Sequence, residues 1–168
     1  TDGQWVHWNQ NQFNYVPPDS ISSNFYPTLG PYSSKDTAII NQHMQMIAQA
    51  RIGVIMTSWW GQGSREDSIT PLLLNAAAPY GIKVGFHMEP YGGRTAQSTV
   101  NDINYINNTY GSHPAYYRAQ DRGNKPVFYI FNSLAISDWS PLAAVNSNNI
   151  ILTQTTDQSK VTYFGGMY

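Results

Sequence analysis

Short apolar runs alternate with longer segments of helical periodicity through most of the 168-residue chain. The run at residues 82–91 places Val84 and Phe86 on one side and His87 on the other, as the two-residue period of a β-strand requires. Pro90 then removes an amide donor and ends the strand. The carboxyl ends of parallel strands are where α/β folds bind ligands. The polar side chains expected at that end are His87, Glu89 and Tyr91.

Four further apolar runs have the length and composition of strands. They are residues 52–60, 126–132, 150–152 and 161–164. The run at 52–60 is apolar on both faces, which is typical of a parallel strand that is covered on both sides.

Segments with helical periodicity lie between these runs. The first is predicted to begin at a cap on Ser33 or Ser34 and to end near Ala50. The others are predicted at residues 69–80 with Pro71 in the first turn and Gly81 as the stop, at 95–110 before Gly111, and at 137–145 with Ser137 as the cap. The alternation of strands and helices predicts a single α/β domain over residues 1–168, with parallel strands and right-handed crossovers.

The first thirty residues show neither period and are predicted to form an ordered loop. Their rings are those of Trp5, His7, Trp8, Phe13, Tyr15, Phe25 and Tyr26. His43 lies on or beside the apolar stripe of the first helix, where a histidine is more often a core residue than a ligand.

Composition narrows the possible partners. Charged residues make up 11% of the chain and aromatic residues 14%, a balance that favours a secreted or lumenal protein that handles carbohydrate. A formal net charge of −1 provides no basic surface for nucleic acid or for an anionic membrane. No apolar run approaches the roughly 18 residues of a membrane-spanning helix. With no cysteine there is no disulfide framework, and Asn107 in Asn-Asn-Thr is a candidate glycosylation site.

The residue types at the predicted strand ends favour a carbohydrate site. Rings can stack on sugar faces, and carboxylate and amide groups can bind hydroxyls. The candidates are Trp59 and Trp60, of which one is expected in the core and the other at the mouth, then His87, Glu89 and Tyr91, then Asn132, and finally the segment 165–168.

Other chemistries find less support. A metal site is not expected, because the four histidines are dispersed and no acidic cluster accompanies them. A serine triad lacks its Gly-x-Ser-x-Gly turn, and the glycines at 61 and 63 lack a nucleotide-binding motif, so no cofactor is expected. A glutamate after a strand is commonly a solvated loop residue. Glu89, however, is one of only two glutamates and lies among His, Pro and Tyr.

Several segments together resemble glycoside hydrolase family 99, the endo-α-mannosidase and endo-α-mannanase family. They are Trp-Val-His-Trp-Asn at 5–9, Phe-Tyr-Pro-Thr-Leu-Gly-Pro-Tyr-Ser-Ser at 25–34, Ser-Trp-Trp at 58–60, His-Met-Glu-Pro-Tyr at 87–91 with Gly-Arg at 93–94, and Tyr-Gly-Ser-His-Pro-Ala-Tyr-Tyr-Arg at 110–118. The resemblance implies a (β/α)8 barrel that cleaves α-mannosides without a metal. It further implies that His87, Glu89 and Tyr91 line the sugar cleft and that Trp59 or Trp60 shapes a neighbouring subsite.

One feature of the family is missing from this sequence. Its catalytic pair stands in a Glu-Trp-x-Glu motif that does not occur here, so Glu89 is expected to assist and not to complete catalysis. The chain corresponds to about strands 2 to 5 of the barrel, whose open edges predict self-association. Two hypotheses follow: a part of an α-mannoside hydrolase that carries the sugar-binding half, or a non-catalytic extracellular protein that binds glycans or forms assemblies.

Overall fold

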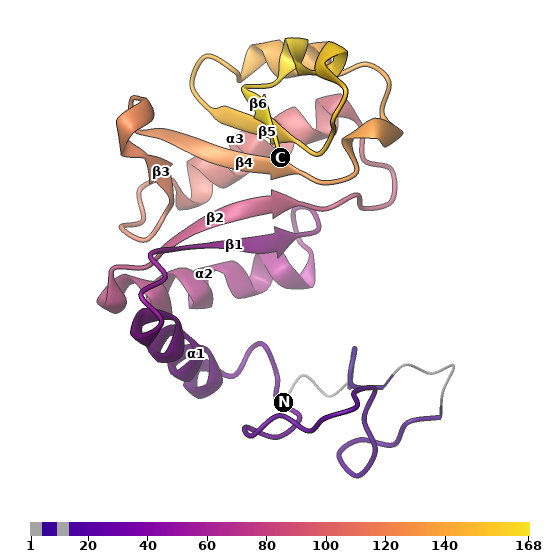
Figure 1. The fold of residues 1–168 in the computed structure, drawn as a ribbon, viewed down its shortest axis with the longest axis vertical. Coiled ribbons are helices and arrows are strands. Elements are labelled where there is room, and N and C mark those ends of the chain that lie inside the picture. Colours follow the sequence, from indigo (N-terminus) through magenta and orange to yellow (C-terminus); the bar gives the residue numbers. More distant parts are fainter. Residues whose placement is uncertain (1–4, 10–13) are drawn as a thin grey trace.

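A parallel β-sheet forms the centre of the molecule (Figure 1). The computed structural model describes residues 5–9 and 14–168. The strand order is β1-β2-β4-β5-β6 with parallel pairing throughout, and β3 pairs antiparallel with β4. The predicted parallel α/β sheet is therefore confirmed. The strands are β1 (Val54–Trp59), β2 (Lys83–Met88), β3 (Arg118–Ala119), β4 (Lys125–Ile130), β5 (Ile150–Thr153) and β6 (Gly166–Met167).

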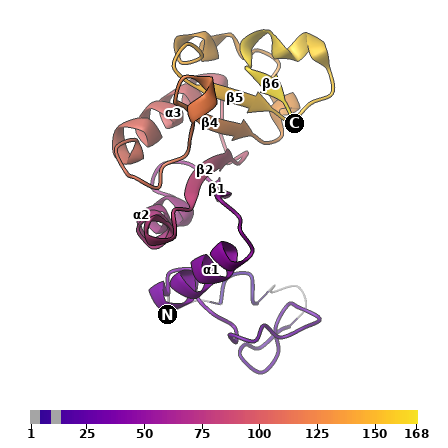
Figure 2. The ribbon, with the colours of Figure 1, turned by 60° about the vertical axis from the view of Figure 1, so that its left-hand side comes forward.

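Three α-helices accompany the sheet, and α2 and α3 lie on the same side of it (Figure 2). None of the helices in the described part of the chain is both long and apolar enough to cross a membrane. The α-helices are α1 (Thr37–Gln49), α2 (Arg65–Ala77) and α3 (Ala96–Tyr110). The 3-10 helices are η2 (Ala78–Tyr80), η3 (Gln120–Arg122), η4 (Ser133–Ala135), η5 (Ser140–Ala144) and η6 (Gln158–Tyr163).

Two helices begin at positions other than those predicted. The carboxylate of Asp36 accepts hydrogen bonds from the first amides of α1, so the cap is Asp36 and not Ser33 or Ser34. Ser64 caps α2, which therefore begins four residues earlier than predicted. Pro71 consequently lies inside α2 and not in its first turn.

The tertiary structure compensates for Pro71 only in part. A proline has no N–H, so the carbonyl of Asp67, four residues earlier, has no α-helical donor. The hydroxyl of Tyr110 lies 3.3 Å from that carbonyl but 2.8 Å from Oδ1 of the same residue. Its single hydrogen is therefore shared, and the carbonyl receives the weaker part.

The predicted strand at 161–164 is wrong. These residues fall at and just after η6, which begins where the side chain of Asp157 accepts a hydrogen bond from the amide of Ser159. The edge strand is β6, two residues further on. The predicted α-helix capped by Ser137 is instead the 3-10 helix η5, preceded by a turn in which Asp138 accepts from the amide of Ser140.

The N-terminal segment is a loop over its described residues, as predicted. The indole N–H of Trp8 donates to the carbonyl of Tyr32 at 2.8 Å, and the rings of Tyr32 and His43 pack edge to face at 5.1 Å. His43 is half-buried and is a packing residue here. Phe13 lies outside the described residues.

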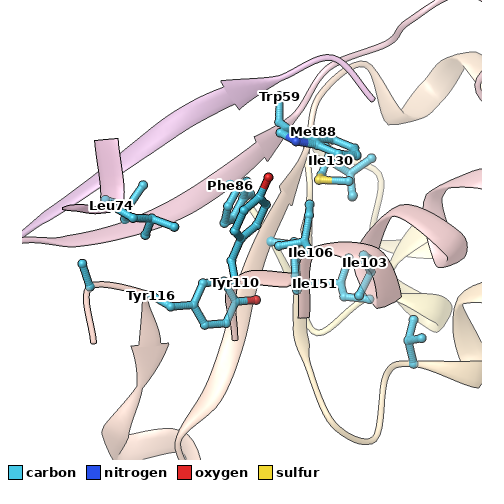
Figure 3. Packing of buried hydrophobic residues seen from close by; sticks show 14 of the residues in the cluster. Trp59, Leu74, Phe86, Met88, Ile103, Ile106, Tyr110, Tyr116, Ile130 and Ile151 are labelled. Carbon is cyan, nitrogen blue, oxygen red and sulfur yellow. The ribbon is translucent and has the colours of Figure 1, made fainter. Parts of the chain in front are cut away.

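The apolar core lies between the sheet and α2 and α3 (Figure 3). The predicted inward residues of α3, Val100, Ile103 and Ile106, are all buried. Phe86 of β2 is fully buried and stacks on Tyr110 with ring centres 6.0 Å apart. Burial of each large apolar side chain contributes roughly 1.5–3 kcal/mol, so this layer fixes β2 and the residues that follow it.

Both edges of the described sheet are open, because β1 pairs only with β2 and β6 only with β5. The predicted edge at 52–60 is thus confirmed as β1. Val54 on this edge is 39% exposed. We expect the chain of residues 1–168 to self-associate at micromolar concentration, because open edges pair with other chains. Size-exclusion chromatography with light scattering would measure this.

A matched pair of variants separates edge pairing from nonspecific association. Val54→Lys places a charge on the open edge and is expected to reduce self-association, measured as a lower molar mass by light scattering. Val16→Lys makes the same change at a residue of the N-terminal loop that is 66% exposed, and is expected to have no effect. A monodisperse monomer with a sharp thermal transition would contradict the prediction.

Candidate functional site

Neighbouring strands place a row of side chains on the inner face of the sheet, which is the face turned away from α2 and α3. The register pairs Ser58 with His87, His87 with Tyr129, and Tyr129 with Leu152. Because successive side chains point to opposite faces, the next residue along each strand points toward the core. The inner face is less buried than the core face and leads to the carboxyl ends of the strands.

Glu89 follows β2 directly, and two side chains hold one of its carboxylate oxygens. Ser58 Oγ donates to Oε1 at 2.9 Å, and His87 Nδ1 lies 2.9 Å from the same oxygen. The residue is only 8% exposed, so it is not the solvated loop carboxylate that a glutamate after a strand commonly is. No hydrogen bond from a described residue reaches Oε2. The carboxylate is therefore fixed in place with one oxygen free to accept.

The other nitrogen of His87 contacts a residue from the far end of the chain. The hydroxyl of Tyr168 lies 2.9 Å from Nε2. Burial and the nearby charge of Glu89 raise the pKa of Tyr168 to about 12, so its hydroxyl remains protonated near neutral pH. Tyr168, His87, Glu89 and Ser58 form a continuous hydrogen-bonded chain across the ends of β6, β2 and β1.

Exposed rings surround this chain of contacts. Trp60, Phe131 and Tyr168 follow the last residues of β1, β4 and β6 and are 45%, 36% and 44% exposed. The ring of Phe131 lies 5.5 Å from that of His87. Such partly exposed rings beside a polar cluster can stack on a sugar.

Arg94 links the ends of β2 and β4 through hydrogen bonds. Its guanidinium donates to the carbonyls of Met88 and Asn132 at 3.3 and 3.0 Å and lies over the ring of Trp139. Burial lowers the pKa of Arg94, while the neighbouring Tyr91 and Glu89 oppose that shift. This cation partly balances the charge of Glu89.

The structure separates the two adjacent tryptophans as predicted, and it shows which one lies where. Trp59 is completely buried, and its indole N–H donates to Asp67 at 3.1 Å. It therefore has no surface for a sugar, which corrects its place among the candidate binding residues. Trp60 remains at the mouth.

The hydroxyl of Tyr91 contacts α3 and none of the described side chains that hold Glu89. It donates to Asp102 at 2.6 Å and lies 2.8 Å from Ser98, both on α3. Burial and the hydrogen bond to Asp102 raise the pKa of Tyr91. The structure thus shows it joining the loop after β2 to α3, whereas the sequence predicted a cleft residue. Asn132 is exposed at the same edge as Glu89, with a left-handed backbone at φ 49°.

Sequence reasoning missed Ser58 and Asp67. Ser58 could have been found only from the register that aligns it with His87. Asp67 is 7% exposed and accepts four hydrogen bonds: Oδ1 from Trp59 and Tyr110, and Oδ2 from the amide of Gly63 and from Tyr105. These five residues are called the Asp67 cluster below. They fix the turn that carries Trp60.

A cavity of about 690 Å³ lies between the N-terminal loop, α1, β1 and α2. Its walls include Trp5, Trp8, Tyr32, His43, Ser58 and Glu66. Glu89 does not line this cavity, but Ser58, which donates to Glu89, does. Within residues 5–9 and 14–168, no three acidic or histidine side chains gather closely enough to hold a metal ion.

The candidate glycosylation site lies inside α3 with both ends of its amide engaged. Asn107 Nδ2 donates to Asn149 at 3.0 Å, and its Oδ1 accepts from Tyr116 at 2.8 Å. A glycan on Nδ2 would have to displace the contact with Asn149 in a half-buried site. The local sequence alone could not reveal this, because Asn149 is distant in the chain.

We expect Asn107 to be unmodified when the protein is made in a secretory host. Mass spectrometry before and after enzymatic removal of N-glycans would measure this. Tyr26→Thr creates a sequon at the exposed Asn24 and provides a positive control. Full occupancy of Asn107 with an unchanged fold would contradict the expectation.

A parallel sheet whose strand ends hold a glutamate, a histidine and a rim of rings is the arrangement of a barrel glycoside hydrolase. The sequence matches the model of glycosyl hydrolase family 99 over residues 1–163. The chain belongs to that family, which confirms the resemblance seen in the sequence.

The relatives are mannosidases by name. The chain is 41% identical to glycoprotein endo-alpha-1,2-mannosidase of Xenopus laevis, covering 79% of this chain and 34% of the relative. It is 35% identical to the human glycoprotein endo-alpha-1,2-mannosidase-like protein, covering 89% and 38%. The chain therefore spans about a third of the length of these curated relatives.

Solved structures confirm the fold. The family 99 endo-alpha-mannosidase of Bacteroides thetaiotaomicron is similar with a TM-score of 0.74 and 36% identity, over 86% of this chain and 45% of that one. The same enzyme in complex with bis-tris propane gives a TM-score of 0.76 and 33% identity, over 96% and 56%. The described sheet is thus part of a barrel of the (β/α)8 type.

Proposed function

We propose that this chain binds an α-mannoside at the carboxyl ends of its strands, as part of an endo-α-mannosidase. The observation that carries the proposal is the geometry of Glu89, whose Oε1 is held by Ser58 and His87 while no described residue donates to Oε2, at strand ends that also carry exposed rings. The names of the relatives supply the sugar class, since they are endo-alpha-1,2-mannosidases.

The arrangement meets both requirements of sugar recognition. A fixed carboxylate oxygen accepts strong hydrogen bonds from hydroxyl groups. The rings of Trp60 and Phe131 offer apolar surface to the C–H faces of a pyranose. Because Ser58 and His87 hold Oε1 in advance, binding costs little reorganisation of the carboxylate.

Hydrolysis needs a second carboxylate. Glycosidases use two positioned acids about the scissile bond, and Glu66 on α2 has no hydrogen bond to Glu89, Ser58 or His87 among the described residues. We therefore assign Glu89 to binding and to assistance of catalysis. The catalytic pair would be supplied by a longer protein that contains this chain. The low charge of the chain and a sugar ligand support a location of that protein in the secretory lumen or outside the cell.

Titration calorimetry with α-1,2-mannobiose tests the proposal, with cellobiose as the control sugar. We expect saturable binding of the mannoside only. Endo-hydrolysis of a high-mannose glycan by the longer protein would support the enzyme assignment. Binding without hydrolysis in that protein would favour a non-catalytic glycan-binding protein, and absence of mannoside binding would refute the proposed function.

A further inference from the structure

Tyr168 contacts the Glu89 site through His87, so its hydroxyl can have a role besides the stacking surface of its ring. It follows β6, and its amide donates to the carbonyl of Thr153 at 3.0 Å. Its ring packs edge to face on Tyr129 at 4.9 Å and on His87 at 5.9 Å. The backbone and two rings thus fix the position of its hydroxyl beside Nε2 of His87.

When the imidazole of His87 is uncharged, it carries one ring hydrogen. The donors and acceptors around it allow only one position for that hydrogen. Nδ1 of His87 lies 2.9 Å from Oε1 of Glu89, and a carboxylate oxygen can only accept, so Nδ1 carries the ring hydrogen. Nε2 is then unprotonated and accepts from the phenol of Tyr168, which holds its proton. With Ser58 also donating to Oε1, that oxygen has two donors and Oε2 has none from the described residues.

We propose that Tyr168 is a positioning residue for the sugar site: it fixes the Nδ1–H tautomer of His87, which orients Glu89 so that Oε2 accepts a hydrogen bond from a mannoside hydroxyl. The part of this inference that names a mannoside as the ligand of Oε2 rests on the proposed function. The part that concerns the tautomer of His87 does not. If the phenol were removed, Nε2 would lose its donor, and only the contact with Glu89 would still favour the Nδ1–H form. The Nε2–H form has no hydrogen on Nδ1, so it would place a lone pair against Oε1 of Glu89.

Nitrogen-15 NMR of the histidine-labelled protein reads the tautomer directly, because protonated and unprotonated ring nitrogens have well separated shifts. His87→Gln identifies the signal among the four histidines. In the parent protein we expect a protonated Nδ1 and an unprotonated Nε2 at neutral pH. In Tyr168→Phe, which retains the ring packing, we expect a mixture of tautomers and an affinity for α-1,2-mannobiose about tenfold weaker.

Tyr80→Phe is the matched control. It removes a hydroxyl from an exposed ring outside the site, for which the described residues provide no hydrogen bond. We expect this variant to change neither the tautomer nor the affinity. A doubly protonated His87 in the parent, or a Tyr168→Phe protein with the parent tautomer and affinity, would overturn the inference.

The two readouts keep this inference separate from the proposed function. Failure of mannoside binding in the parent, together with the expected tautomer and its loss in Tyr168→Phe, would refute the ligand but retain the positioning role. Mannoside binding that is unaffected by Tyr168→Phe would retain the ligand and refute the positioning role.

Discussion

Replacement of Glu89 by glutamine is expected to raise the Kd for an α-mannoside by about 10- to 100-fold, since hydrogen bonds to charged groups contribute about 1.5–3 kcal/mol. The amide oxygen of glutamine can take the place of Oε1 and accept from Ser58 and His87. The amide nitrogen then occupies the place of Oε2. It can donate but cannot accept, so the sugar hydroxyl loses its acceptor.

The same substitution is expected to change the free energy of unfolding by less than about 1 kcal/mol, because both internal hydrogen bonds survive. This separates a binding role from a structural one even though Glu89 is buried. Calorimetric titration and urea denaturation of the same samples measure the two quantities. Glu66→Gln is the matched control at the other glutamate, and it is expected to leave the affinity unchanged. Parent affinity in Glu89→Gln would remove Glu89 from the site.

Much of the fold could be predicted because its strongest signals are local. The alternation of apolar and polar residues in 82–91 and the breaker Pro90 were sufficient to place β2 and the polar residues after it. The apolar stripe of α3 was sufficient to place its buried face. Helix starts were harder, because Ser33, Ser34 and Asp36 all suit a cap and only the fold shows which one is used.

The candidate site could be predicted only in part, because it is assembled across strands. His87 and Glu89 are near neighbours in sequence and were found together. Their partners Ser58 and Tyr168 lie 31 residues before Glu89 and 81 residues after His87. The segment 165–168 was among the predicted strand ends, but its contact with His87 and the whole contribution of Ser58 are visible only in the structure. Local alternation indicated that one tryptophan of the pair at 59–60 is buried, but it took the contact with Asp67 to show which.

Removal of the carboxylate of Asp67 is expected to destabilise the protein strongly. Asp67→Ala leaves the indole of Trp59, the hydroxyl of Tyr105 and the amide of Gly63 without their acceptor, while Tyr110 keeps only the backbone carbonyl of residue 67. Each such loss costs about 1–3 kcal/mol, but the losses overlap because the cluster can relax and admit water. We expect the free energy of unfolding to fall by about 3–5 kcal/mol.

Asp67→Asn distinguishes the carboxylate from the volume of the side chain. The side chain of asparagine keeps one acceptor oxygen, but its NH2 group is a donor and would face the backbone N–H of Gly63, which is also a donor. We therefore expect the free energy of unfolding to fall by about 1–3 kcal/mol. Urea denaturation followed by tryptophan fluorescence measures this. Hydrogen exchange at Gly63 provides a local readout, because its amide loses the only partner it has among the described residues.

The Asp67 cluster also links stability to the site, since it fixes the turn that presents Trp60. Asp67→Asn is therefore expected to weaken mannoside binding about threefold to tenfold without touching the sugar, a change that corresponds to roughly 0.6–1.4 kcal/mol. Glu66→Gln, one residue earlier on α2, should change neither stability nor affinity. Unaltered stability in Asp67→Asn would show that water or another donor arrangement satisfies the cluster. Lower stability with parent affinity would show that Trp60 does not depend on this cluster.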